Sequence, residues 1–161
     1  QIAGQKVEIF KPASDVRYDE TEVVSHDKNS IHSTPVESSS NMVLLADDVQ
    51  VVGVDEAQFF DEGIIQVAND LANQGKRVVI AGLDLDFKGR PFGPMPHLLA
   101  TAEYVTKLHA ICRRTGGPAH FSYRKVEGDA TFMLGETGEY EPVSRVIYNE
   151  LNAKNIENQR S

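Results

Sequence analysis

The run VVGVDEAQFF, residues 51–60, constrains the fold more than any other part of the chain. Mostly apolar, β-forming residues end there in two adjacent acids, Asp55 and Glu56. A short apolar run of this kind is typical of a buried strand in a parallel sheet. In open α/β sheets, ligands bind beyond the carboxyl ends of the strands. We therefore predict a strand over residues 51–55 whose acids face a ligand site. The alternative is a strand that ends in a solvated acidic turn.

A second strand of the same design is predicted at residues 77–87, RVVIAGLDLDF, with the acids Asp84 and Asp86 near its end. Two such strands in one parallel sheet would place four carboxylates near one edge. Between them, residues 63–75 carry apolar side chains at helical spacing and close on Gly75. This alternation predicts an α/β fold with a mainly parallel sheet flanked by helices.

Other segments complete the predicted core and a smaller appendage. In the core we expect a strand at 6–11, extended pieces at 23–27 and 31–36, helices at 36–47 and 93–104, and a last strand at 104–112. After Cys112 the pattern predicts a hairpin in 113–125, an extended loop in 130–142 and a helix in 144–161. The predicted division is therefore an α/β core, residues 1–111, and a β-rich subdomain with a C-terminal helix, residues 112–161.

Composition limits the possible partners. The formal net charge of −8 argues against a nucleic acid as the main partner. No apolar stretch approaches the length of a membrane span, so we expect no membrane partner either. The single cysteine, Cys112, excludes an internal disulfide framework and indicates a reducing, cytoplasmic location.

Two further segments suggest ligand contacts. The segment GLDLDFKGRPFG, residues 82–93, carries Phe87 and Phe92, whose flat surfaces suit a nucleobase. The alternative is a turn rich in Gly and Pro with core phenylalanines. Asp15 and Arg17 follow the first predicted strand, where an arginine could bind phosphate. A surface ion pair is the alternative for these two residues.

Taken together, these segments resemble the type II thymidine kinases, the family of the human cytosolic enzyme and of most bacterial ones. The matching segments are QIAGQKVEIFKPASDVRY, VVSHD, VDEAQFF, GLDLDFKGRPFG, YVTKLHAIC and GETGEYEP. The resemblance implies a P-loop-kinase, RecA-like core with a small β-rich lasso subdomain. It also implies transfer of the ATP γ-phosphoryl group to the 5′-hydroxyl of thymidine or deoxyuridine, with Mg²⁺, in deoxynucleotide salvage. A homotetramer inhibited by dTTP is typical of the family.

The resemblance implies roles for individual residues. Glu56 falls on the catalytic base, and Asp55 falls on the acid that holds Mg²⁺ through water. Asp15 and Arg17 match the family's D-x-R near the phosphates. The matches to the thymine pocket and to the loop that closes it are Phe59, Leu83, Phe87, Phe92, Ser122, Phe132, Met133, Leu134, Gly135 and Tyr140.

The sequence departs from the family's pattern at the phosphate-binding loop. It contains no GxxxxGK[ST] motif, and its opening QIAGQ resembles the end of a helix. We therefore expect the family's first strand and P-loop to be missing, and this chain alone to be inactive. The alternative function is a module that binds thymidine or dTTP without phosphoryl transfer. A fragment of another P-loop ATPase, such as a recombinase core, is disfavoured by the acidic charge.

A second departure concerns zinc. Many family members carry four zinc-binding cysteines, whose positions here are occupied by Cys112, Thr115, Ser144 and Ile147. A structural zinc site needs four nitrogen or sulfur ligands. We therefore predict no zinc, as in some bacterial members, with packing of residues 146–148 in its place.

Overall fold

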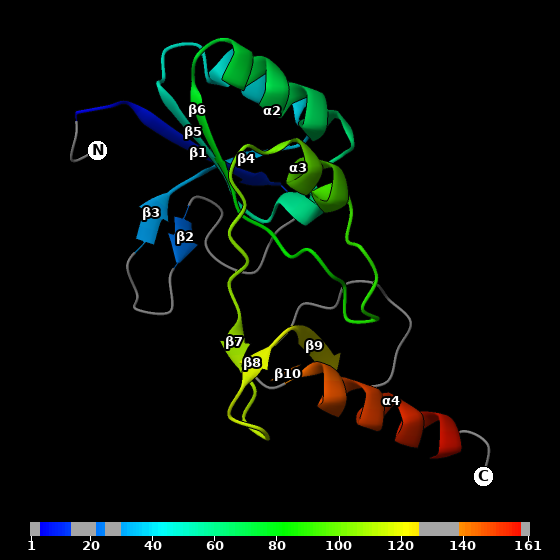
Figure 1. The fold of residues 1–161 in the computed structure, drawn as a ribbon. Coiled ribbons are helices and arrows are strands. Elements are labelled where there is room, and N and C mark those ends of the chain that lie inside the picture. The colour runs from blue at the N-terminus through cyan, green and yellow to red at the C-terminus, as the bar shows by residue number, and fades with distance from the viewer. Residues whose placement is uncertain (1–3, 14–21, 25–29, 126–138, 159–161) are drawn as a thin grey trace. The chain divides into compact units, whose positions relative to one another are not determined.

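The computed structural model describes residues 4–13, 22–24, 30–125 and 139–158 (Figure 1). Contacts between residues divide the chain into two compact units. Unit 1 comprises Gln1–Asp84 and Phe92–Ala102, and unit 2 comprises Leu85–Pro91 and Glu103–Ser161. Residues 85–91 and 103–111 thus group with unit 2.

Unit 1 is built on a four-stranded parallel sheet in the order β4-β1-β5-β6 (Figure 1). Its strands are β1 (Val7–Pro12), β4 (Thr34–Val36), β5 (Val51–Val54) and β6 (Arg77–Ile80). Phe10 of β1 pairs with Thr34 on one side and with Val54 on the other. The chain passes from β4 across β1 to β5, so the strand order reverses at β1, where open α/β sheets commonly bind ligands. The predicted parallel sheet is confirmed.

One face of this sheet packs against helices. The helices are α1 (Ser40–Leu45), α2 (Gly63–Asn73) and α3 (Met95–Thr101). Val52 and Val54 of β5 are buried in the same apolar cluster as residues from all three helices. Along β6 the burial alternates, and Val79 is 51% exposed. The predicted helix at 63–75 is confirmed, whereas α1 and α3 are shorter than the predicted helices.

Two short strands of unit 1 lie outside this sheet. They are β2 (Glu22–Val24) and β3 (Ser30–His32), which pair in antiparallel fashion. The remaining residues of the extended piece predicted at 23–27 lie outside the described residues.

Unit 2 holds two antiparallel strand pairs and the C-terminal helix. Its elements are β7 (Ala110–Ile111), β8 (Pro118–Ala119), β9 (Phe121–Arg124), β10 (Tyr140–Val143) and α4 (Arg145–Asn158). Its own apolar cluster contains Cys112, Ala119, Phe121, Val143 and Tyr148. The sequence predicts a small β-rich unit with a terminal helix for this part of the chain.

The prediction of a last core strand over residues 104–112 is wrong. Only Ala110–Ile111 is a strand, whereas Tyr104 is 94% exposed and Leu108 is 89% exposed. The apolar pattern of this segment suits a strand, but a strand also needs a neighbour to pair with its backbone N–H and C=O groups. Within the described residues, no strand pairs with 104–109.

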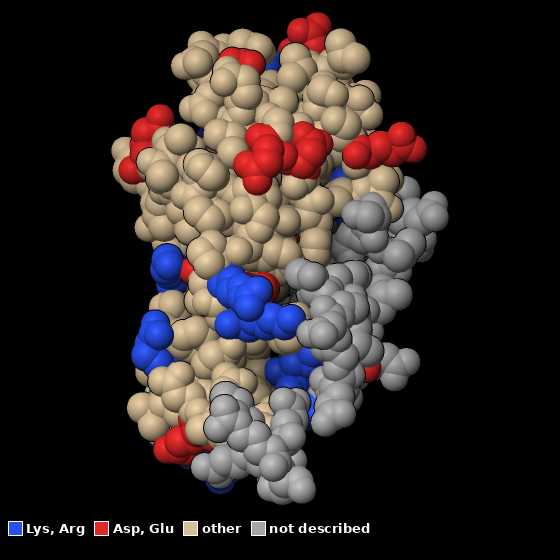
Figure 2. All heavy atoms as spheres, turned by 90° about the vertical axis from the view of Figure 1, so that its right-hand side faces the viewer, with Lys and Arg blue, Asp and Glu red and all other residues tan. Residues whose placement is uncertain are grey.

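On the face drawn in Figure 2, most of the surface is uncharged, and acidic and basic side chains occur on it as scattered small groups. None of the helices in the described part of the chain has the length and apolar character that a membrane span requires.

The burial of α2 predicts a large stability difference between two leucine-to-alanine variants. Leu71 on α2 is 1% exposed and Leu44 on α1 is 81% exposed. We expect Leu71→Ala to lower the free energy of unfolding by about 2–5 kcal/mol, because it leaves a cavity in the core. Leu44→Ala should change it by less than about 0.5 kcal/mol. Urea denaturation of both variants measures the difference, and equal losses would contradict the packing described for α2.

Candidate active site

The turn after β5 carries both predicted acids and is held by strands on each side. The N–H of Asp55 donates to the carbonyl of Phe10 at 2.9 Å, and the N–H of Ala57 donates to the carbonyl of Ala81 at 3.0 Å. Asp55 and Glu56 are both half-buried. These bonds continue the sheet pairing past the strand end. The predicted position of the two acids at the carboxyl end of β5 is confirmed.

Glu56 has an unusual backbone conformation. Its φ of 51° and ψ of 41° place it in the left-handed region, and it is the one non-glycine residue with positive φ in the described part of the chain. Such a conformation costs an L-residue about 1–2 kcal/mol. It persists only where the surroundings enforce it, and such residues cluster at functional sites. Here Glu56 also starts a 3₁₀ turn, η1 (Ala57–Phe59).

The side chains of the turn are tied to one another. The Glu56 N–H donates to Oδ1 of Asp55 at 3.0 Å. Oε2 of Glu56 accepts a hydrogen bond from the amide of Gln58, which is 3% exposed. Gln58 is not among the site residues predicted from the sequence. The available signal is a polar residue between Ala57 and the two phenylalanines of an otherwise apolar segment.

Three of the residues predicted for the thymine pocket, Phe59, Leu83 and Phe92, belong to unit 1. Each contacts or belongs to the turn after β5. The rings of Phe59 and Phe92 meet edge to face with centroids 5.3 Å apart. The N–H of Leu83 donates to Oε1 of Gln58 at 2.9 Å. Phe92 is positioned by its N–H, which donates to the carbonyl of Asp84 at 3.1 Å.

The other described pocket residues belong to unit 2. Phe87 lies against the guanidinium of Arg124, whose Cζ is 4.8 Å from the ring centroid. The hydroxyl of Tyr148 donates to the carbonyl of Phe87 at 2.9 Å. Ser122 is exposed on β9, and Tyr140 is half-buried on β10, paired with Arg124.

Several predicted site residues lie outside the described residues. They are Asp15, Arg17, Phe132, Met133, Leu134 and Gly135.

The acids of the second predicted strand differ in their environment. Oδ1 of Asp86 accepts hydrogen bonds from the N–H groups of Lys88 and Arg90, each at 2.8 Å, so this carboxylate closes a turn. Asp86 belongs to unit 2 and Asp84 belongs to unit 1.

The residues at this site fit Mg²⁺, whereas they do not fit Zn²⁺. Magnesium is commonly held by one or two carboxylates, and waters and substrate phosphates supply its other ligands. Asp55, half-buried at the end of a strand, can supply such a carboxylate. Within the described residues, no group of three or more His, Cys, Asp or Glu side chains could hold a metal ion. The four aligned zinc positions supply one thiol, which does not fit a structural zinc site.

Cys112 instead belongs to the apolar cluster of unit 2. It is fully buried, and Ile147 and Tyr148 pack in the same cluster, as predicted. The prediction for Val146 is wrong, because this side chain is 63% exposed on α4. A hydrogen bond with the Thr115 hydroxyl and backbone N–H groups lower the pKa of the Cys112 thiol to about 6.

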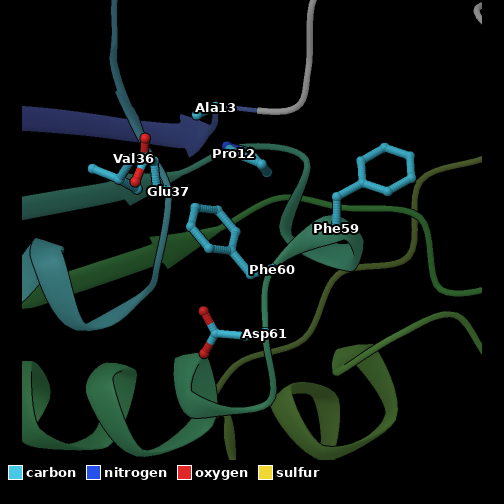
Figure 3. A pocket seen from close by; sticks show the side chains of 7 residues that line it. All are labelled: Pro12, Ala13, Val36, Glu37, Phe59, Phe60 and Asp61. Atoms are coloured by element: carbon cyan, nitrogen blue, oxygen red, sulfur yellow. The ribbon is translucent and has the colours of Figure 1, made fainter.

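A hollow of about 620 Å³ opens at the carboxyl ends of β1 and β4 (Figure 3). It is lined by Pro12, Ala13, Val36, Glu37, Phe59, Phe60 and Asp61. Phe59 is the one residue of this lining that the sequence predicts for the site. The rings of Phe59 and Phe60 project in different directions from η1 (Figure 3).

Asp61 connects this hollow to α1 and α2. Its carboxylate accepts the Ser39 N–H at 2.9 Å, the Ser39 hydroxyl at 2.7 Å and the Gly63 N–H at 2.9 Å. The backbone and hydroxyl bonds from Ser39 lower the pKa of Asp61, since they favour the ionised form.

Asp61→Asn tests this network. Because the pKa of Asp61 is lower in the folded state, its stabilising effect is complete above the unfolded pKa of about 3.9 and is lost as pH falls through the folded pKa. We expect Asp61→Asn to cost roughly 1 kcal/mol at pH 7. The gap to wild type should narrow below about pH 4. Chemical denaturation at several pH values measures this difference in the free energy of unfolding, with Asp47→Asn at an exposed position as the control. A difference that does not change with pH would contradict the lowered pKa of Asp61.

Gly93→Ala tests the packing of the turn after β5. Gly93 has a φ of +48°, and a Cβ there would lie 2.2 Å from the carbonyl oxygen of Gln58. Gly75, in the same unit, has a φ of +82° and open space around it. We expect Gly75→Ala to cost about 1–2 kcal/mol from backbone strain alone. Gly93→Ala should cost about 2–5 kcal/mol, because overpacking adds to strain. Chemical denaturation compares them, and equal costs would show that the contact with Gln58 is absent.

Known proteins are similar to this chain over most of its length. The thymidine kinase family model matches residues 1–148. A thymidine kinase of Porphyromonas gingivalis is 62% identical over 148 residues, which are 92% of this chain and 72% of the relative. The thymidine kinase of Bacteroides fragilis is 59% identical, with 92% of this chain and 74% of the relative covered. A Rhodothermus thymidine kinase is 55% identical, with 90% and 68% covered. The chain therefore belongs to the thymidine kinase family.

Proposed function

We propose that the protein transfers the γ-phosphoryl group of ATP to the 5′-hydroxyl of thymidine or deoxyuridine, as a type II thymidine kinase. The observation that carries the proposal is the turn after β5, which presents Asp55 and Glu56 at the edge of the sheet where the strand order reverses. Family membership supports the reaction, and the position of the acids supports the assignment of roles.

Glu56 is proposed as the general base. A sugar hydroxyl is a poor nucleophile, and a carboxylate within hydrogen-bond reach can accept its proton as the phosphoryl group is transferred. The enforced backbone of Glu56 and the hydrogen bond from Gln58 keep its carboxylate in place before substrate arrives. Such preorganisation is what a positioned base requires.

Asp55 is proposed to hold Mg²⁺ through water, and Asp15 and Arg17 are proposed to lie near the phosphates. When bound, Mg²⁺ neutralises charge that develops on the phosphoryl oxygens. An arginine beside the phosphates would do the same with its fork of donors. The hydrogen bond from the Glu56 N–H to Oδ1 orients the Asp55 carboxylate.

The proposed contacts to the thymine base begin with Phe59 and Phe92, which already form an edge-to-face pair that offers an apolar wall. Leu83, which is 50% exposed, would extend this wall, and Phe87 is a further proposed contact. The proposed contacts from the lasso are the hydroxyl of Ser122, the ring of Tyr140 and the backbone of residues 132–135. Closure of this loop would exclude water, the competing phosphoryl acceptor.

The finer architecture and setting are also proposed from the family. The parallel order β4-β1-β5-β6 is compatible with a P-loop-kinase, RecA-like core, and the strand pairs of unit 2 are compatible with a zinc-free lasso subdomain. The proposed core comprises residues 1–111 and the proposed lasso subdomain with its helix residues 112–161. We further propose a cytoplasmic homotetramer inhibited by dTTP, with neither nucleic acid nor membrane as partner.

Glu56→Gln tests the assignment of the base. In the full-length protein we expect kcat for thymidine phosphorylation to fall by roughly 10²- to 10⁴-fold, which is the usual contribution of a general base. The dissociation constant of thymidine should change little, because the amide keeps the shape of the side chain. Glu62→Gln is the control, since Glu62 has a side chain that is 70% exposed and lies before α2. Initial rates and calorimetric titration measure both quantities.

Three results separate the possible functions. Loss of kcat with thymidine still bound supports Glu56 as the base. If Glu56→Gln transfers phosphate as fast as wild type, the base assignment is wrong. If wild type binds thymidine but transfers no phosphate, the protein is the nucleoside-binding module rather than a kinase.

A further inference from the structure

Gln58 is buried at the centre of the turn after β5, where its side-chain amide has two partners in unit 1. We propose that Gln58 is a positioning residue, which holds the carboxylate of Glu56 and the backbone of Leu83 in one fixed arrangement. The inference rests on the proposed role of Glu56 as the base. It adds a residue that contacts no reacting atom and acts through the base.

The chemistry of the two partners determines the orientation of the amide. The Leu83 N–H can only donate, so the group 2.9 Å from it must be the amide oxygen of Gln58. The amide nitrogen then faces Oε2 of Glu56, which accepts. A flipped amide would place two donors together at Leu83 and two oxygens together at Glu56. A single orientation of the Gln58 amide therefore satisfies both hydrogen bonds, the one to Glu56 and the one from Leu83.

Gly82 and Gly93 lie so close to Gln58 that a side chain at either position would contact it. A Cβ added at Gly82 would lie 2.8 Å from Oε1 of Gln58 and 2.9 Å from Sδ of Met95. A Cβ at Gly93 would lie 2.2 Å from the backbone oxygen of Gln58. Gln58 is thus enclosed on both its backbone and its side chain by the loop that leaves β6. Such close packing restricts a side chain to few rotamers.

This arrangement links the base to the thymine pocket. A carboxylate at the end of a Glu side chain can adopt several orientations. A hydrogen bond to one of its oxygens reduces that number, so less entropy is lost when the substrate binds. The same amide holds Leu83, which is a proposed wall of the pocket. We therefore expect Gln58 to affect kcat through Glu56 and substrate affinity through Leu83, as two separable effects.

Two substitutions separate these effects in the full-length protein. Gln58→Glu keeps the shape and an acceptor for the Leu83 N–H, but it replaces the amide donor with a second carboxylate oxygen beside Glu56, so that repulsion replaces the hydrogen bond. We expect kcat to fall roughly 10- to 100-fold, with KM for thymidine within about 2-fold of wild type. Gln58→Met keeps the volume and removes both bonds, so kcat should fall similarly and KM should also rise. A melting temperature for each variant reports on folding.

A matched control and a double-mutant cycle complete the experiment. Gln66 on α2 also donates its amide to a carboxylate, Oδ1 of Asp70 at 2.8 Å, so Gln66→Glu makes the same change away from the turn. We expect it to leave kcat within about 2-fold of wild type. Gln58→Glu is also introduced into Glu56→Gln. If Gln58 acts through Glu56, Gln58→Glu should lower the residual kcat of the Glu56→Gln variant by less than about 2-fold.

The outcomes distinguish this inference from the proposed function. A large loss from Gln58→Glu in wild type, with almost none in the Glu56→Gln background, supports the inference. Equal losses in both backgrounds, or a loss no larger than that of Gln66→Glu, would overturn it while Glu56 remains the base. If Glu56→Gln alone is fully active, the proposed base fails and the inference fails with it. Should Gln58→Glu not fold, Gln58→Met in both backgrounds makes the same comparison, with the same two outcomes.

Discussion

The candidate site depends on backbone hydrogen bonds that continue between neighbouring strands after the strands themselves have ended. The N–H of Asp55 reaches back to Phe10 of β1, and the N–H of Ala57 reaches across to Ala81 beyond β6. The turn that carries both acids is therefore fastened on each side, and the left-handed backbone of Glu56 between these two bonds can be maintained. Without this fastening, a residue other than glycine would relax out of that conformation. A sheet that buries apolar side chains on one face thus also sets the position of its charged residues at the edge.

Space is the second constraint. The loop that leaves β6 approaches η1 closely: a Cβ at Gly93 would overlap with the backbone oxygen of Gln58, and a Cβ at Gly82 would displace the side chain of Gln58 or Met95. This close approach allows a single amide to bond both Glu56 and Leu83. In unit 2, Phe87 is held in a comparable way, by the Tyr148 hydroxyl on its carbonyl and Arg124 on its ring. In each unit, residues proposed to contact the nucleoside are therefore supported by buried neighbours that would not touch it.

Much of unit 1 could be predicted from the sequence, because its signals are local. The run VVGV followed by Asp55 and Glu56 has the pattern of a buried strand with acids at its end, and the periodicity of residues 63–75 is that of α2. The errors arise where structure depends on distant partners. Residues 104–109 have the composition of a strand, yet strand pairing depends on a neighbour that no local pattern can supply. A polar residue in an apolar segment is only a weak signal for Gln58, because its contacts with Leu83 and Gly93 are far along the chain. The prediction that Val146 is buried fails because the orientation of the helix directs Ile147 and Tyr148 into the cluster instead.

The proposed role of Glu56 is best tested by a crystal structure of the full-length protein with thymidine bound, in which the distance from the Glu56 carboxylate to the 5′-oxygen is measured. We expect a separation of about 2.6–3.2 Å, the range for a base that takes a proton directly. We also expect the amide of Gln58 to remain hydrogen-bonded to both Glu56 and Leu83. A thymidine whose 5′-oxygen lies beyond about 5 Å from Glu56, or against a different acid, would contradict the claim that this turn performs the chemistry.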